Sequence, residues 1–353
     1  MPMGYGRVRT VLPDAVCGPG GKGAGLGDLA ALKPTVMAGV PMVWERIRKG
    51  MHTKVAQKGA LVESIFNASI WLMWHSLTTF GPNPLASLLN KTVFALGRKI
   101  TGGRLRIGIC GGAAVSDDTV KFISSTLCIL LQGYGMTEIS GVASVVTPDL
   151  GYRTGTVGLP FPGLDFRLID VPDAGYYASE NCGELWLRGP SVTSQYYENE
   201  AENKSAFAEG GWFKTGDVIR FNEDGTMSII DRIRNLVKLQ NGEYLAVEKL
   251  EAMYRDSGSL KNICIIADSS REYLVAVVEP ADDNVTTDEI LSSLRAIAAK
   301  NALSKIETVR GVYVSRGEEW MTNGYLTTTG KLKRKVIYER LRHEIEDVYR
   351  KSR

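Results

Sequence analysis

The organisation of the chain is decided by the stretch GGWFKTGD at 210–217, which continues through NEDG at 222–225 to DRIR at 231–234. It places a carboxylate in a Thr-Gly-Asp turn, then a hairpin, then an Asp-Arg pair before a basic run. The NEDG loop has glycine where a hairpin needs a positive φ. This order suits a nucleotide held where two domains meet, so we predict one domain over residues 1–231 and a small one over 232–353.

Upstream of this stretch, short apolar strands alternate with helices. Strands are predicted at 35–38, 105–110 and 129–132, and each of the last two is followed directly by glycine. Between them we expect a helix from Pro41, which suits a first helical position, a helical tract from about 51 to 77, and helices up to 100 and over 116–124. This alternation predicts an α/β layer with a mainly parallel sheet.

From residue 156 the pattern changes to short strands separated by Pro, Gly, Asn and Asp. Strands over 165–169, 183–188, 217–222 and 226–231 predict an antiparallel β subdomain. After Arg234 the sequence predicts a compact α+β domain. It has a helix over 247–254, a capping box at Thr286 and a last amphipathic helix over 335–349.

Composition describes an ordinary globular protein and excludes several classes of function. The 353 residues are 44% hydrophobic and 23% charged, with a formal net charge of +3, too small to indicate nucleic acid as a partner. Five scattered cysteines fit reduced thiols in the cytoplasm rather than a disulfide scaffold. Three scattered histidines give little support to a metal site or a triad.

The most apolar window, Ile65 to Phe80, is shorter than the roughly 20 apolar residues of a membrane span. It reads either as a core helix or as a peripheral contact with a membrane surface through Trp71 and Trp74.

The stretch Gln132-Gly133-Tyr134-Gly135-Met136-Thr137-Glu138 follows an apolar strand, where open α/β sheets bind ligands. Its glycines allow close backbone approach, and Tyr134 offers a ring face to a base. Thr137 can bond a phosphate oxygen, and Glu138 is a hard ligand suited to Mg²⁺. Gly111, Gly112 and Ala113 would lie alongside, although both segments also fit ordinary strand-to-helix turns.

Three further groups lie downstream. Asp217 could accept two hydrogen bonds from a ribose diol, and Arg232 suits ribose or phosphate oxygens. Lys331 follows Gly330 on a loop before the last helix. Taken alone, Thr-Gly-Asp is a common turn, and a lone lysine is usually a solvated surface charge.

Taken together, these segments resemble the long-chain fatty acyl-CoA synthetases of the adenylate-forming superfamily. Tyr134–Glu138, Thr215–Asp217, Asp231-Arg232 and Gly330-Lys331 stand in that family's order and spacing. GVPMVWE at 39–45 and KLQNGEY at 238–244 look like its long-chain branch.

The resemblance implies a two-step ligation: a fatty carboxylate attacks the α-phosphate of ATP to give acyl-AMP, and the thiol of coenzyme A then forms the thioester. Its substrates would be a long-chain fatty acid, ATP and coenzyme A, with Mg²⁺ as activating metal and no prosthetic group. It also implies that residues 1–231 are the C-terminal part of a large AMP-binding domain and that residues 232–353 are a mobile domain. We expect a cytoplasmic protein, peripheral on the endoplasmic reticulum or another organelle membrane.

Carried over position by position, the resemblance gives each candidate a role. The adenine would lie against Gly111, Gly112, Ala113, Gln132, Gly133, Tyr134 and Gly135. Thr137 would contact phosphate, Glu138 would hold Mg²⁺, and Asp217 would bind the ribose with Arg232 nearby. Lys331 would bridge phosphate and carboxylate oxygens, and Arg234 would be the domain hinge. Gly242 and Glu243 would approach the coenzyme A channel.

The chain departs from the family pattern in two minor places and one major one. Gly210 stands where the family usually has Asp, and Ile233 where it has Lys. The family's phosphate loop, rich in Ser, Thr and Gly, has no counterpart in residues 1–33. We therefore expect an N-terminally truncated chain that begins inside the large domain. Three hypotheses stay open: a fragment of a long-chain ligase, an inactive remnant that serves at most as an AMP-binding or interaction module, and a medium-chain ligase, against which residues 39–45 and 238–244 weigh.

We predict that residues 1–353 alone form acyl-AMP far more slowly than a complete ligase, because contacts to the β- and γ-phosphates are missing. Fatty-acid-dependent exchange of pyrophosphate into ATP, measured on the purified chain, tests this. Robust exchange would show that the expectation is wrong.

Overall fold

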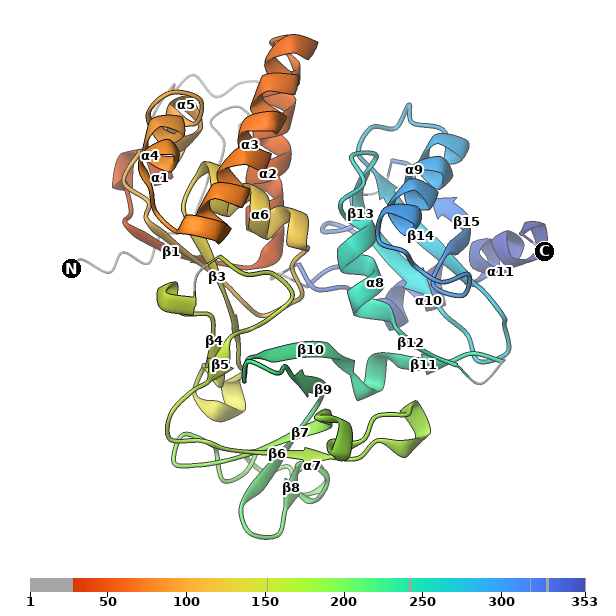
Figure 1. The fold of residues 1–353 in the computed structure, drawn as a ribbon. Coiled ribbons are helices and arrows are strands. Elements are labelled where there is room, and N and C mark those ends of the chain that lie inside the picture. The colour runs from red at the N-terminus through yellow and green to blue at the C-terminus, as the bar shows by residue number, and fades with distance from the viewer. Residues whose placement is uncertain (1–27, 151, 241–242, 318, 328–329, 353) are drawn as a thin grey trace. The chain divides into compact units, whose positions relative to one another are not determined.

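The computed structural model describes residues 28–150, 152–240, 243–317, 319–327 and 330–352 (Figure 1). The chain divides into two compact units, each described here by itself. The first lies within residues 1–135 and 144–159, and the second comprises residues 136–143 and 160–353. This division does not test the predicted boundary at residue 231, which stays a prediction.

The first unit is a sheet covered by helices. Its helices are α1 (Asp28–Leu32), α2 (Pro41–Ala56), α3 (Ala60–Phe80), α4 (Pro84–Lys91), α5 (Ala95–Lys99) and α6 (Asp117–Thr126). Its strands are β1 (Val36–Gly39), β2 (Ile107–Cys110), β3 (Ile129–Tyr134), β4 (Ser144–Val145) and β5 (Leu159–Pro160), which continues into the second unit. Strands β1, β2 and β3 are parallel neighbours, and β4 pairs antiparallel to β3. The predicted parallel α/β layer is therefore confirmed.

The core of the first unit is built around Trp44 of α2, whose side chain is fully buried. A Cβ on Gly108 of β2 would lie 2.8 Å from the Trp44 ring and 2.9 Å from Leu130 of β3. Glycine at 108 is thus what lets the indole lie directly on the sheet. Helices α2, α3 and α6 pack against one another over this core, and Ser116 caps α6 by accepting a hydrogen bond from the Thr119 N–H, 3.2 Å away.

The predicted helical tract over 51–77 is wrong in its bounds. Gly59 has a φ of +100°, and the chain forms two helices, α2 and α3, on either side of it. Helix α3 buries Phe66, Met73 and Leu77 but leaves other apolar side chains exposed. No helix among the described residues reaches the length and apolar character that a membrane span needs.

The second unit begins with an antiparallel sheet in the order β10-β9-β7-β6. Its strands are β6 (Asp165–Ile169), β7 (Cys182–Arg188), β8 (Phe207–Ala208, paired with β9), β9 (Trp212–Phe221) and β10 (Met227–Arg232), with α7 (Glu200–Ala206) between β7 and β8. The predicted hairpin is confirmed: the Asn222 N–H donates to the Thr226 carbonyl over 2.8 Å, and Gly225 has a φ of +80°. This unit also contains the one-turn 3-10 helices η1 (Thr137–Ile139), η3 (Pro172–Ala174), η4 (Ala178–Glu180) and η5 (Ile233–Asn235), whereas η2 (Pro148–Leu150) belongs to the first unit.

The rest of the second unit is the predicted α+β piece. It contains β11 (Leu236–Lys238), β12 (Tyr244–Ala246), α8 (Val247–Tyr254), β13 (Leu260–Ile266), β14 (Leu274–Pro280), α9 (Thr287–Lys300), β15 (Val309–Val314), α10 (Arg334–Arg340) and α11 (Arg342–Lys351). Its capping box at Thr286 and Glu289 is confirmed. The prediction of a single last helix over 335–349 is wrong. The helical conformation is interrupted at Leu341, where ψ is 25°, and two helices form on either side of it.

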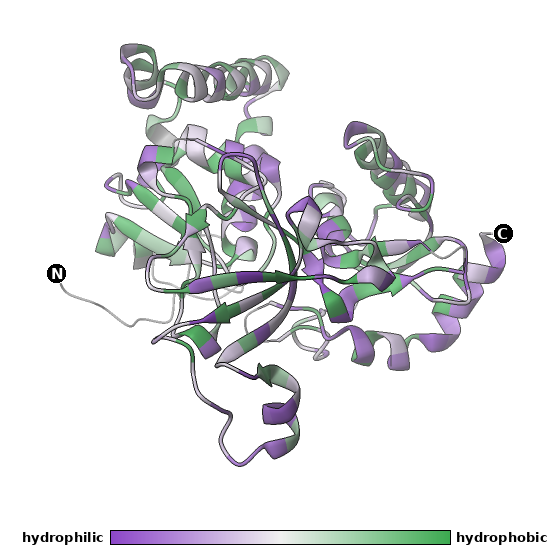
Figure 2. Cartoon of the chain, turned by 60° about the horizontal axis from the view of Figure 1, so that its bottom comes forward, coloured by the Kyte–Doolittle hydropathy of each residue, from purple (hydrophilic) through white to green (hydrophobic). Residues whose placement is uncertain are grey.

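The central strand β14 is buried on both faces. Leu274, Ala276 and Val278 belong to one apolar cluster and Val275 and Val277 to another, as the two-residue period of a strand requires. The first cluster also takes in residues of α8 and α9, and the second takes in residues of α10 and α11. Helix α11, next to the C-terminus, is mostly hydrophilic (Figure 2). It packs against the sheet through two buried residues, Ile345 and Tyr349, which belong to the second cluster.

Candidate functional site

The candidate adenine residues of the first unit lie at the carboxyl ends of β2 and β3. Cys110 pairs with Gln132 in the parallel register, so Gly111 and Gly133 emerge side by side. A Cβ on Gly111 would lie 3.2 Å from the Gly133 carbonyl oxygen. The structure thus brings Gly111 next to Gly133, as the sequence predicts, and the other predicted adenine residues adjoin these two along their segments.

Two details of this edge differ from expectation. Strand β3 runs to Tyr134, two residues past its predicted end, and the Tyr134 side chain is buried. The Gln132 side chain is also buried, and its Nε2 has no hydrogen-bond partner among the described residues. Because a buried amide donor without a partner is costly, it is the kind of group that a bound ligand satisfies.

Thr137 and Glu138 open the second unit in the one-turn helix η1. Thr137 is exposed and Glu138 half-buried. The Tyr196 hydroxyl donates to Glu138 Oε1 over 3.0 Å. Burial first, and then this hydrogen bond, raise the pKa of Tyr196 to about 12, so its hydroxyl stays a proton donor.

The donor set at Glu138 fits a magnesium ion. No cluster of three or more His, Cys, Asp or Glu side chains suited to a metal is found among the described residues. A single carboxylate is what Mg²⁺ uses when phosphates and waters supply its other ligands.

Asp217 lies in strand β9, as the predicted strand over 217–222 requires, but β9 already begins at Trp212, so Thr215 and Gly216 belong to the strand rather than to a turn before it. Gly216 has a φ of +69°, and the pairing of β7 with β9 shifts register between Glu184 and Trp186, which is a β-bulge. The Thr215 hydroxyl donates to the Leu185 carbonyl over 2.7 Å and accepts from the Asp217 N–H over 3.1 Å. The bulge lies next to Asp217, whose carboxylate is directed toward Arg232.

Asp217 and Arg232 are direct partners across the β9–β10 hairpin. Arg232 Nε donates to Asp217 Oδ1 over 3.0 Å, and the Asp217 side chain is 2% exposed against 51% for Arg232. A buried carboxylate needs such a partner. The structure thus brings together the two residues that the sequence assigned to the ribose.

Lys331 follows Gly330, which stands directly after two residues outside the described part of the chain, and Leu326 and Leu332 on either side form a β-bridge. The Thr327 N–H donates to the Lys331 carbonyl over 2.8 Å, and the Lys331 N–H donates to the Thr327 hydroxyl over 3.0 Å. The Lys331 side chain is exposed. Three residues on, the Arg334 guanidinium donates to both oxygens of the buried Glu251 over 2.6 and 3.1 Å, which fixes where α10 starts.

The remaining predicted residues lie near the segment that links β10 to β12. Arg234 is exposed in η5. Glu243 is exposed, and its carbonyl accepts from the Leu239 N–H over 2.8 Å. Gly242 lies outside the described residues. The hinge and channel roles are not tested and stay predictions.

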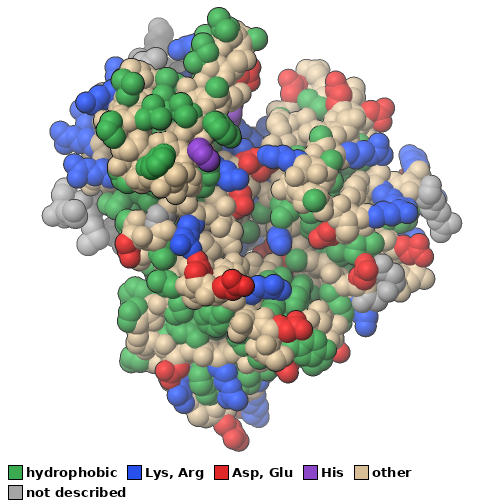
Figure 3. Space-filling view, viewed as in Figure 1, with side chains coloured by type: hydrophobic (Ala, Val, Ile, Leu, Met, Phe, Trp, Pro, Cys, Tyr) green, Lys and Arg blue, Asp and Glu red, His purple; other side chains and the backbone are tan. Residues whose placement is uncertain are grey.

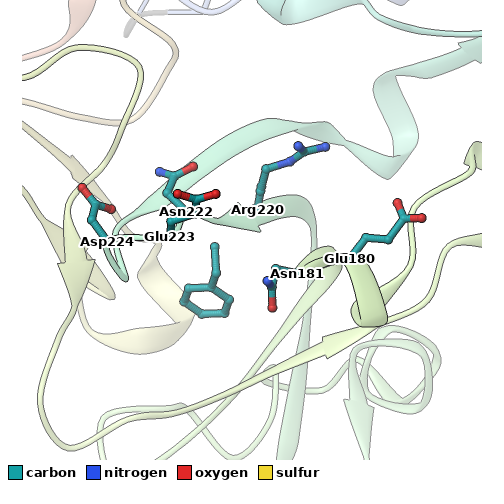
Figure 4. A pocket seen from close by; sticks show the side chains of 7 residues that line it. Glu180, Asn181, Arg220, Asn222, Glu223 and Asp224 are labelled. Atoms are coloured by element: carbon teal, nitrogen blue, oxygen red, sulfur yellow. The ribbon is translucent and has the colours of Figure 1, made fainter.

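The structure also shows residues that sequence reasoning missed. Tyr196 bonds to the predicted residue Glu138, which stands 58 positions earlier in the chain. Arg334, three residues after the predicted Lys331, bonds to Glu251, which stands 83 positions earlier. A hollow of about 590 Å³ is lined by Glu180, Asn181, Arg220, Phe221, Asn222, Glu223 and Asp224 (Figure 4). It includes none of the predicted site residues.

Comparison with known proteins places the chain in a family. Residues 8–197 match the family model described as AMP-binding enzyme, and the chain belongs to that family. It is 37% identical over 357 residues to long-chain-fatty-acid–CoA ligase 2 of Schizosaccharomyces pombe, which covers 92% of this chain and 52% of that protein. It is 36% identical to long-chain-fatty-acid–CoA ligase 3 of Saccharomyces cerevisiae, over 99% of this chain and 52% of that protein. The chain therefore spans about half the length of these curated relatives.

Solved structures give the same fold. The adenylation domain of the carboxylate reductase from Mycobacterium chelonae is similar with a TM-score of 0.74 and 26% identity, over 92% of this chain and 48% of that one. The corresponding domain from Segniliparus rugosus, solved with AMP and a co-purified carboxylic acid, has the same TM-score and identity. The predicted resemblance to adenylate-forming enzymes is confirmed.

Asp231, next to Arg232, gives a prediction for stability against pH. Burial raises its pKa from 3.8 to about 6, even though its carboxylate accepts from the N–H groups of Arg232 and Glu248. Between these two pH values the folded state binds more protons than the unfolded chain, so the free energy of unfolding falls as the pH rises and then levels off.

The variant Asp231→Asn lacks this titration. The difference in the free energy of unfolding between wild type and variant should change from pH 4 to about pH 6 and be constant above it. Urea unfolding at several pH values measures the difference. Curves that stay parallel over the whole range would contradict the raised pKa.

Proposed function

We propose that this chain carries the adenylate-handling residues of a long-chain fatty acid–CoA ligase. The Asp217–Arg232 pair carries the proposal: a buried carboxylate, aimed by a bulge and partnered by a half-exposed guanidinium, is suited to ribose hydroxyls and phosphate. Membership of the AMP-binding enzyme family and likeness to ligases named for long-chain fatty acids support the substrate class.

In the first step a fatty carboxylate attacks the α-phosphate of ATP, and pyrophosphate leaves. The Lys331 ammonium lies on an exposed, hydrogen-bonded loop, where it can reach oxygens of both reactants. Neutralising two anions that must approach each other lowers the barrier. Mg²⁺, held with the phosphates by Glu138, would neutralise further charge, and Thr137 would donate to a phosphate oxygen.

In the second step the thiol of coenzyme A attacks the acyl carbon, and AMP leaves. The nucleotide must stay bound during this step. Asp217 and the proposed adenine residues at 111–113 and 133–135 therefore keep their roles. The negative charge of the fatty carboxylate, which Lys331 neutralises in the first step, is gone, because the carboxylate has become the acyl group of acyl-AMP. The two steps therefore differ in their need for this lysine.

In a full-length version of the protein, replacing Lys331 with alanine should slow acyl-AMP formation about 100-fold, while thioester formation from supplied palmitoyl-AMP and coenzyme A stays near the wild-type rate. The two half-reactions are measured separately on wild type and variant. Lys335, whose side chain is 89% exposed on α10, provides the matched control, since Lys335→Ala should leave both steps unchanged. Equal loss in both half-reactions would refute the role given to Lys331.

We also propose that the protein is cytoplasmic and peripheral on an organelle membrane, with helix α3 as the contact. Leu61, Ile65, Trp71, Leu72 and Phe80 of α3 are exposed, by 75% at Leu61 and 68% at Trp71, and Leu88 of α4 adds to the patch. Hydrophobic side chains gather over these helices in Figure 3. Glu63 is the one Asp, Glu, Lys or Arg of α3, whereas Lys54, Lys58 and Lys91 flank this helix along the chain, which favours an anionic bilayer surface.

Replacing Trp71 with serine should reduce co-flotation of the chain with anionic vesicles several-fold, because the indole loses its apolar contact. Tyr197, an aromatic residue of the second unit that is 87% exposed, supplies the control variant Tyr197→Ser. Equal flotation of both variants, or no flotation of the wild type, would count against α3 as the contact.

A further inference from the structure

The turn that carries Glu138 is joined to the segment after β7 by three hydrogen bonds. The Thr193 N–H donates to the Glu138 carbonyl over 2.7 Å. The Ser140 hydroxyl donates to the Ser191 carbonyl over 3.0 Å. The third bond, from the Tyr196 hydroxyl to Glu138 Oε1, differs in kind, because it holds the functional side chain itself.

Tyr196 is in turn held from both sides of its backbone. Its N–H donates to Asn203 Oδ1 over 2.6 Å, and its carbonyl accepts from Asn203 Nδ2 over 3.0 Å. Its ring packs edge-on against Phe207, with ring centroids 5.9 Å apart. One amide thus clamps both polar backbone atoms of Tyr196, and the ring contact sets the direction in which the hydroxyl points.

A flexible glutamate loses rotamer freedom when it binds a cation, and a partner that already restricts it removes part of that cost. The Tyr196 hydroxyl occupies one carboxylate oxygen, and no hydrogen bond to Oε2 is found among the described residues. The hydrogen bond therefore leaves one hard oxygen for a metal. Because the phenol is neutral, it orients the carboxylate without cancelling its charge.

We propose that Tyr196 is a positioning residue for the metal bound with the nucleotide, and that Asn203 sets Tyr196 in place. This inference rests on the role of Glu138 in the proposed function. Tyr196 acts through Glu138 and needs no contact of its own with the substrate. Removing the hydroxyl while keeping the ring should loosen the carboxylate and leave the packing against Phe207 intact.

The test measures Mn²⁺ binding in place of Mg²⁺, by the loss of the free-ion electron paramagnetic resonance signal, with the non-hydrolysable analogue α,β-methylene-ATP present. Tyr196→Phe should weaken Mn²⁺ binding about tenfold, the lower range for loss of an outer-shell partner. The neighbouring Tyr197, 87% exposed, gives the matched control Tyr197→Phe, which should bind as wild type. Urea unfolding of each variant checks that the fold is kept.

A double-mutant cycle separates positioning from a general structural effect. In the Glu138→Gln background, Tyr196→Phe should have no further effect on Mn²⁺ binding. The same tenfold loss in both backgrounds, or no loss in the wild-type background, would overturn the role of Tyr196 and leave that of Glu138 standing. If Glu138→Gln binds Mn²⁺ as well as wild type does, the metal role of Glu138 fails and the proposal for Tyr196 fails with it.

Discussion

The candidate site depends most on one constraint, the ion pair between the buried Asp217 carboxylate and the half-exposed Arg232 guanidinium. A carboxylate that is 2% exposed would be strongly destabilising without a partner. Gly216 adopts a positive φ and makes the β-bulge that turns Asp217 toward Arg232. The pairing of β9 with β10 places the two residues opposite each other. The register of β10 against β9 shifts between Ile229 and Asp231, so this irregularity, and not the hairpin loop alone, places Arg232 opposite Asp217.

Local chemistry predicted much of the fold. The helix start at Pro41, the cap at Ser116, the hairpin glycine at 225 and the capping box at Thr286 all act within a few residues, so their patterns are readable in the sequence. The errors occur where local signals are weak. Gly59 lies within one predicted helical tract, and no glycine or proline near Leu341 indicates that the last helix is interrupted there.

The sequence proposes the candidate side chains of the site but not the residues that support them. Thr-Gly-Asp looked like a turn, because a bulge inside a long strand becomes visible only when the partner strand is known. Tyr196 supports Glu138 from 58 positions away, and Arg334 reaches Glu251 from 83 positions away. Such pairings depend on how distant segments meet, which no spacing along the chain encodes.

The supports share a physical logic. Lys331 is exposed on a loop, and Glu138 is half-buried in a one-turn helix. Each is tied, one step away, to something buried or clamped: the loop of Lys331 to the Arg334–Glu251 pair, and Glu138 to Tyr196 with its Asn203 clamp. Electrostatic stabilisation of a reacting phosphate requires charges that are already in place. A chain that kept the functional residues but lost these anchors would retain the family's sequence pattern and lose the preorganisation on which its chemistry depends.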